Sequence, residues 1–193
     1  MSAAGEQDVG QEVAQPFVAD GEVVTRGEGG RVSQRANFRG GVLEGESAIY
    51  DEDGQVVQRA TFKGGLLDGP MVIYGKGRPV AKSHFKDGKL DGESVTYDEE
   101  GRILVRATYR AGKLDGDSTW FDKEGRVVKR SQYRGGALEG FSVEYYPSGK
   151  VFTRAQFKGD KLDGELVTFA EDGKVKERVA YRGGKPQPAP RKA

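Results

Sequence analysis

An aromatic residue followed by a basic one returns seven times along this chain at an almost constant interval. The interval is 24 residues in every case but one, where it is 23. A period of this length is typical of one supersecondary unit that is copied many times and stacks on its neighbours. We therefore expect a repeat array, and because a catalytic site is a singular constellation, we predict that the chain is not an enzyme. The pairs are Phe38-Arg39, Phe62-Lys63, Phe85-Lys86, Tyr109-Arg110, Tyr133-Arg134, Phe157-Lys158 and Tyr181-Arg182.

The composition narrows the classes of protein that are expected. Among the 193 residues there are 30 glycines, and 35% of the residues are hydrophobic, which suits many short strands and turns. Charged residues make up 32% of the chain but leave a net charge of only +1, so we expect no nucleic-acid partner. The absence of cysteine excludes disulfides, thiolate zinc sites and thiol catalysis.

Neither a membrane span nor a secretion signal is expected from the sequence. No run of about 18 apolar residues occurs in it. Residues 1–15 lack the basic start and the apolar stretch of a signal peptide. We therefore expect a cytoplasmic location, with export as the alternative if a signal has been removed.

Each copy carries further fixed positions. A Leu-acidic-Gly triplet follows the aromatic-basic pair, a second aromatic follows the triplet, and a glycine-closed turn then leads to a basic residue. The triplets begin at Leu43, Leu67, Leu90, Leu114, Leu138 and Leu162. The second aromatics are Tyr50, Tyr74, Tyr97, Phe121, Tyr145 and Phe169. The basic residues are Arg59, Lys82, Arg106, Arg130, Arg154 and Arg178.

Side chains alternate with a period of two between these turns, which predicts β-strands. The run 98–101 (Asp-Glu-Glu-Gly) suits a hairpin loop closed by a left-handed glycine. This loop would place Tyr97 opposite Ile103 and Thr96 opposite Leu104. One copy is a residue shorter, and a two-residue loop at 76–77 would keep its strands in register. The glycine of each triplet is typical of a β-bulge.

The predicted fold is all-β: an elongated, single-layer antiparallel β-meander built from about seven 24-residue β-hairpin repeats. The repeat domain is expected over 16–184, with a degenerate cap at 16–36 and repeats that begin near 37, 61, 84, 108, 132 and 156. Residues 1–15 and the proline-rich residues 185–193 are expected to be disordered tails, since prolines interrupt strand pairing.

The pattern aromatic-basic-x-Gly-Lys-Leu-Asp-Gly, with an aromatic five residues after the last glycine, resembles the MORN repeat, and especially its bacterial variant. The resemblance covers about residues 17–184, and the chain is similar to YwqK-family antitoxins of toxin–antitoxin systems. It implies a bacterial antitoxin or immunity protein that binds and neutralises a toxin. MORN units usually carry another glycine two residues after the triplet. This chain has serine, methionine or leucine there, which disfavours a membrane-lipid role.

Catalytic, cofactor and metal sites are not predicted. His84 is the single histidine, and a solvent-facing strand residue is the simpler interpretation of it. The acidic turns lack the ligand spacing of a calcium loop, and turn formation accounts for them. No histidine or lysine outside the repeat pattern stands ready to activate one of the recurring serines.

The second face of the sheet carries the candidate binding surface. If the aromatic and small residues share one face, apolar pairs above each turn would lie on the other, beside the basic residues. The predicted pairs are Ile49 with Val57, Ile73 with Val80, Thr96 with Leu104, Trp120 with Val128, and Glu144 with Phe152. An exposed apolar stripe bordered by arginine is typical of a protein-binding surface. The candidate partner-binding residues are Trp120, Phe141, Tyr146, Phe152, Leu104, Arg106, Arg130 and Arg154.

Several alternatives stay open. The arginines could serve the fold alone, by pairing with Glu46, Glu93, Asp117 or Glu165. If the partner were a basic toxin, the acidic turns at 51–53 and 98–100 would matter most. The basic ladder could instead bind a membrane surface or a polyanion, a use that the near-neutral charge disfavours. Sheet edges could also pair with a second copy, which would make the chain a self-associating scaffold.

Overall fold

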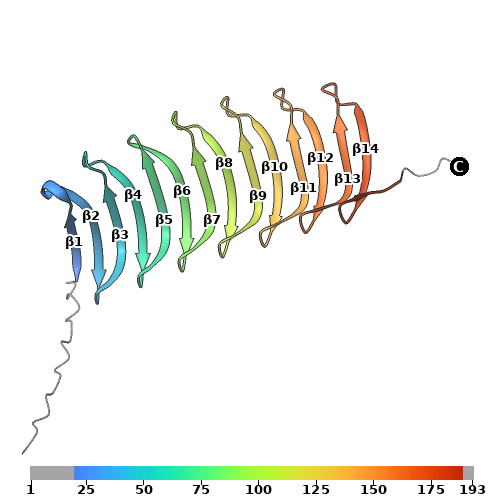
Figure 1. Ribbon diagram of the computed structural model, residues 1–193. Helices are drawn as coiled ribbons and strands as arrows, with labels where there is room; N and C mark the ends of the chain where they lie inside the picture. Colours follow the sequence, from blue (N-terminus) through green and yellow to red (C-terminus); the bar gives the residue numbers. More distant parts are fainter. Residues whose placement is uncertain (1–19, 189–193) are drawn as a thin grey trace, which may run out of the picture.

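Fifteen strands form one antiparallel sheet in chain order in the computed structural model, which describes residues 20–188 (Figure 1). The sheet is a single layer of hairpins, as predicted. Two prolines limit the last strand to two residues, so the predicted tail from 185 begins with a short strand. The strands are β1 (Gly21–Arg26), β2 (Val32–Arg39), β3 (Val42–Tyr50), β4 (Val56–Lys63), β5 (Leu66–Gly75), β6 (Arg78–Lys86), β7 (Lys89–Tyr97), β8 (Ile103–Arg110), β9 (Lys113–Phe121), β10 (Val127–Arg134), β11 (Ala137–Tyr145), β12 (Val151–Lys158), β13 (Lys161–Phe169), β14 (Val175–Arg182) and β15 (Lys185–Pro186), with one 3-10 turn, η1 (Glu28–Gly30).

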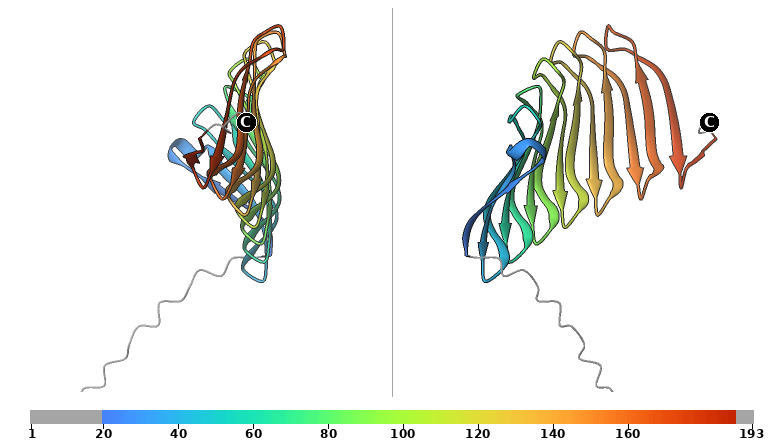
Figure 2. Two further views of the ribbon diagram at one scale, coloured as in Figure 1. Left: turned by 90° about the vertical axis from the view of Figure 1, so that its right-hand side faces the viewer. Right: turned by 60° about the vertical axis from the view of Figure 1, so that its left-hand side comes forward.

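The sheet twists steadily along its length, and its strands are bowed (Figure 2). No second layer covers it within residues 20–188, so each face is open to solvent. The predicted cap forms a complete hairpin, β1–β2, and its residue Arg35 pairs as the basic residues of the later copies do. The predicted tail 1–15 and the last five residues lie outside the described part of the chain.

The bulge at the Leu-acidic-Gly triplet is confirmed. Phe85 pairs with Leu90 and Ser83 pairs with Ser94, so three residues of β7 stand opposite His84 alone. Gly92 has φ +114°, and a Cβ there would lie 3.3 Å from the Cβ of His84. Both the backbone conformation and the lack of space therefore require glycine at this position.

A second bulge, which was not predicted, follows each glycine-closed turn. Tyr97 pairs with Ile103 as expected, but Thr96 pairs with Val105, which leaves Leu104 as the extra residue. The shorter copy keeps its predicted two-residue loop, with Tyr74 opposite Pro79. Its register shifts in the same way at the next pair, because Ile73 lies opposite Ala81. All five predicted apolar pairs are therefore wrong by one residue. The observed pairs are Ile49–Gln58, Ile73–Ala81, Thr96–Val105, Trp120–Lys129 and Glu144–Thr153.

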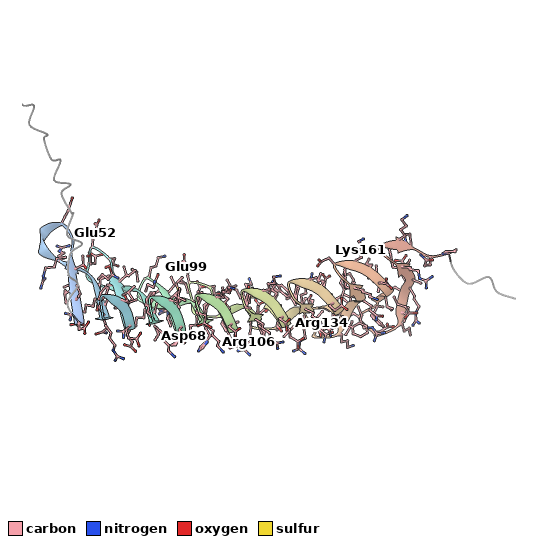
Figure 3. All side chains as sticks on the ribbon, turned by 90° about the horizontal axis from the view of Figure 1, so that it is seen from below. Glu52, Asp68, Glu99, Arg106, Arg134 and Lys161 are labelled. Carbon is pink, nitrogen blue, oxygen red and sulfur yellow. The ribbon has the colours of Figure 1, made fainter. Side chains whose placement is uncertain are left out.

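Pairing across strands puts residues on a common face, and successive residues of a strand alternate between faces. The basic residues form one row across the sheet, and we call their side the basic face. This row reads Arg35, Ala48, Arg59, Val72, Lys82, Val95, Arg106, Thr119, Arg130, Val143, Arg154, Val167 and Arg178. Figure 3 shows Arg106 and Arg134 projecting from the same side of the sheet.

The opposite side carries a row of small residues, and we call it the small-residue face. Ser118 and Ser131 in this row are 1% and 0% exposed although the sheet has a single layer. Larger side chains in the flanking rows must therefore close over them. The row reads Ala36, Ser47, Ala60, Met71, Ser83, Ser94, Ala107, Ser118, Ser131, Ser142, Ala155, Leu166 and Val179.

The triplet also ties each repeat to the next one, a role that the sequence did not reveal. The carbonyl oxygen of Leu90 accepts a hydrogen bond from the backbone N–H of Gly112 at 2.7 Å. The carboxylate of Asp91 accepts one from the N–H of Ala111 at 3.0 Å. The acidic residues of the other triplets accept equivalent bonds from the turn that follows them. These contacts join each triplet to the turn at the start of the next repeat.

Candidate interaction surface

The basic row on the basic face is partly structural. Arg106 pairs with Glu93 at 3.3 Å and Arg178 pairs with Glu165 at 3.2 Å, two of the pairings named above as an alternative. Val95 and Val167 lie between basic neighbours in this row and are buried, 6% and 0% exposed. The methylene stems of long basic side chains can cover apolar neighbours in this way. The row therefore helps to build the sheet.

The C-terminal half of the basic face carries a different arrangement. The guanidinium carbon of Arg154 lies 5.7 Å from the centroid of the Phe141 ring, within the range of a cation–π contact. Phe152 shares the face, because it lies two residues from Arg154 on β12. Its ring meets the ring of Tyr146 edge to face, with the centroids 5.0 Å apart. We call Phe141, Tyr146, Phe152 and Arg154 the aromatic patch.

The aromatic patch is held in place yet open to solvent. The hydroxyl of Tyr146 donates to the carbonyl oxygen of Phe169 in the next hairpin at 2.8 Å. The backbone N–H of Phe141 donates to Oε1 of Gln132 at 3.0 Å. Phe141 is 45% exposed and Phe152 is 37% exposed, so both rings offer apolar surface to a partner. Within residues 20–188, no carboxylate lies within ion-pair distance of Arg154.

The eight predicted binding residues do not form one surface. Leu104, Arg106 and Arg130 share the basic face with the aromatic patch. Trp120 does not: it pairs with Val105 and Lys129, on the small-residue face. The ammonium of Lys129 lies 5.8 Å from the Trp120 ring centroid. The unpredicted bulge explains the difference, because it reverses which residues above the turn share a face with the arginines.

The two aromatic series also lie on opposite faces. Phe85 and its equivalents pair in the rows beside the small residues, as predicted. Tyr97 lies two residues from Val95 and therefore faces the basic side, where the ammonium of Lys82 approaches its ring at 5.8 Å. The prediction that aromatic and small residues share a face is thus right for the first series and wrong for the second.

The aspartates that open the acidic turns accept hydrogen bonds from the backbone of the same turn. Oδ1 of Asp98 accepts from the N–H groups of Glu100 and Arg102 at 3.0 and 2.9 Å, and Oδ2 pairs with the Arg102 guanidinium at 2.7 Å. Desolvation alone would raise the pKa of Asp98, but these hydrogen bonds lower it overall. Asp122 makes the same contacts in its turn, and its pKa is lowered for the same reasons.

His84 lies on the strand beside the triplet bulge, with Nδ1 3.2 Å from the carbonyl oxygen of Asp91. Among residues 20–188, no three carboxylate or imidazole side chains gather into a group that could hold a metal ion. The same part of the chain offers no helix with the length and apolarity that a membrane span needs.

Among the comparisons with known proteins, one family match agrees with the repeat architecture. No curated protein matches the chain. One similar solved structure is described as a crystal structure of a GtfA/B complex bound to UDP and GlcNAc, with 9% sequence identity and a TM-score of 0.26. The match covers 58% of this chain and 22% of that chain. Residues 43–63 match the family described as MORN repeat variant. The chain therefore contains a MORN repeat variant, which indicates a repeat-based interaction or binding module.

Proposed function

We propose that this protein is a non-enzymatic binding module that holds a protein partner on its basic face, with the aromatic patch as the anchor. The observation that carries the proposal is the exposed pair of rings, Phe141 and Phe152, with the guanidinium of Arg154 above the first. Aromatic residues and arginine are the residues that most often dominate the energy of protein interfaces.

The patch departs from the repeat, and the fold does not require it. Position 141 is glutamate or aspartate in four other copies, at Glu46, Glu93, Asp117 and Glu165. Tyr146 stands where Asp98 closes its turn, and Phe152 stands where Leu104 forms the bulge. A large ring in place of a charged strand residue adds exposed apolar surface to an otherwise polar position, and a partner would account for it.

The rigidity of the patch favours binding. Tyr146 is fixed by its bond to Phe169, and it supports the ring of Phe152. Arg154 already lies over Phe141 before a partner arrives. Association therefore costs less side-chain entropy than it would on a loop, because these rotamers are largely set by the sheet.

The specific version of the proposal is an antitoxin or immunity protein that neutralises a toxin. It is supported by the resemblance to bacterial antitoxins over residues 17–184. The MORN repeat variant found at 43–63 supports the broader role of a binding module. A sheet of fourteen long strands can cover a large part of a partner's surface, so occlusion of an active site would not require a pocket.

Co-expression with the product of the adjacent reading frame in a bacterial host tests this proposal. That product alone should arrest growth, and this protein should restore it. A Phe141→Ala/Phe152→Ala double variant should fail to restore growth, whereas Trp120→Ala, on the opposite face, should succeed. A harmless neighbouring product would overturn the antitoxin role. Rescue by the double variant, with loss of rescue by Trp120→Ala, would overturn the choice of face.

A further inference from the structure

The two ends of the sheet leave strand edges without a neighbour among residues 20–188. At one end, β1 pairs only with β2. At the other, β15 pairs with β14 only through Tyr181 and Arg182, and the N–H of Gln187 adds one bond to the carbonyl oxygen of Ala180. The outer edge of β14 over residues 175–179 therefore faces no strand of the described chain. These edges lie at opposite ends of the molecule (Figure 1).

The two edges match because the sheet is a repeat. In the last complete hairpin, Val167 pairs with Arg178 and Leu166 pairs with Val179. At the first hairpin, Val24 pairs with Arg35 and Val23 pairs with Ala36. β1 thus occupies the same place in its copy as β13 does, and its run Val-Val-Thr at 23–25 matches the Leu-Val-Thr at 166–168.

Earlier in the sheet, every strand that is equivalent to β14 in its repeat is followed by a strand equivalent to β13. The pair β12–β13 shows the register: Arg154 lies opposite Val167, and Ala155 lies opposite Leu166. Within residues 20–188, β15 ends at Pro186, and no described residue pairs with β14 at the equivalent positions. Open backbone groups at such an edge are a template for a strand from another molecule.

We infer that a second copy of this chain supplies the missing strand. Its β1 adds antiparallel to the open edge of β14, with its Val24 opposite Arg178, its Val23 opposite Val179 and its Thr25 opposite Glu177. The basic row and the small-residue row then run unbroken from one molecule into the next. The contact is head to tail, so each molecule keeps one free end and the assembly grows without closing.

Burial at the two ends supports this occupant. Ala155, covered by strands on both sides, is 8% exposed, whereas Val179 at the equivalent position of β14 is only half-buried. Val24 is 36% exposed, although Val167 at its equivalent position is completely buried. A joined pair of molecules would give both valines the neighbours that their counterparts have. Because only about four residues of each edge pair, the association should be weak and should depend on concentration.

Sedimentation velocity over a wide concentration series tests the inference on the full chain. The weight-average mass should rise above 21.0 kDa with concentration and should not level off at the dimer. Val23→Glu and Val179→Lys should each weaken this rise, since each would place a charge beside a valine in the junction. Leu66→Lys, an exposed mid-sheet residue on β5, is the matched control and should leave the rise unchanged.

The two variants together fix the register. A mixture of Val23→Glu and Val179→Lys molecules should associate more strongly than either variant alone, because glutamate and lysine then face each other. A single 21.0 kDa species at every concentration would overturn the inference. A plateau at the dimer would overturn it as well, since that result indicates a two-fold contact between identical edges. Association that neither end variant weakens would place the contact elsewhere on the molecule and would overturn the inference too.

Discussion

Trp120 and Arg106 lie on neighbouring strands but on opposite faces of the sheet. Thr119, not Trp120, is the residue that pairs with Arg106, and Trp120 pairs with Val105 one position along. The tryptophan is half-buried and lies beside the buried serines on the small-residue face, with Lys129 near its ring. The tryptophan therefore lies on the face opposite the aromatic patch, and we expect it to serve packing.

Trp120→Ala should lower the free energy of unfolding without affecting partner binding. We expect a loss of roughly 2 kcal/mol, about half the cost of removing a fully buried tryptophan. Urea unfolding followed by circular dichroism measures this loss. The matched variant Phe141→Ala, which removes a ring that is 45% exposed, should cost clearly less. A larger loss for Phe141→Ala would show that the two faces have been assigned the wrong roles.

The sequence predicted the hairpin repeat, its turns and the glycine bulge, because each of these requires a residue type that recurs at a fixed position of the repeat. Glycine is required at position 92 because φ there is positive. The two-residue loop at 76–77 follows from the length of its copy, which is one residue shorter. The second bulge has no such marker. The extra residue is Leu104 in one copy and Phe152 in another, and neither residue type indicates a bulge.

The missed bulge decided how much of the candidate surface could be predicted. Phe141, Tyr146 and Phe152 were predicted because they differ from their equivalents in other copies. In the structure Tyr146 packs against Phe152, and Phe141 lies under Arg154 on the same strand pair. Trp120 differs in the same way, but a shift of one residue moves a side chain to the other face. The acceptor role of Asp91 was hidden for another reason: its partner, Ala111, lies 20 residues further along the chain.

The buried serines on the small-residue face provide a second test. The hydroxyls of Ser131 and Ser142 lie 2.8 Å apart, whereas Oγ of Ser118 has no hydrogen-bond partner among the described residues and is 1% exposed. Ser118→Ala should therefore stabilise the protein by about 1 kcal/mol, since it removes a buried hydroxyl that gains nothing. Ser131→Ala should destabilise it by a similar amount, because Ser142 would lose its partner. Urea midpoints of the two variants should move in opposite directions, and a loss of stability in Ser118→Ala would contradict this account.

Two glycines separate the effect of backbone conformation from that of space. Gly101 has φ +85°, and a Cβ added there would meet no atom within 4 Å, whereas a Cβ at Gly92 would press on His84. Alanine at Gly101 should cost about 1 kcal/mol from the left-handed conformation alone. At Gly92 the cost should reach roughly 2–4 kcal/mol, because crowding adds to the same strain. Equal losses in thermal or urea unfolding would show that the bulge can relax around a side chain.

The turn carboxylates should make stability depend on pH in the acid range. The backbone N–H and the ammonium of Lys174 lower the pKa of Asp172 below its ordinary value of 3.8, and the pKa values of Asp98 and Asp122 are lowered as well. A carboxylate with a lowered pKa stabilises the fold fully above the ordinary value. This contribution is lost as the pH falls from 3.8 through the folded-state pKa.

The midpoint of thermal unfolding should therefore fall below about pH 4 and change little between pH 5 and 7. Asp122→Asn keeps a side-chain oxygen for the turn but cannot titrate, so its midpoint should fall less steeply on acidification. Leu66→Lys, far from these turns, should follow the wild-type profile. A wild-type midpoint that is flat down to about pH 2 would contradict the assignment of these groups.

The central claim is that the basic face, through the aromatic patch, is the surface that binds a partner. Isothermal titration of the adjacent reading frame's product into wild type, Phe141→Ala/Phe152→Ala and Trp120→Ala tests it most directly. The double variant should raise the Kd at least about tenfold, because two anchors are lost. Trp120→Ala should change the Kd less than about threefold. A double variant that binds like wild type, with binding lost in Trp120→Ala, would contradict the claim.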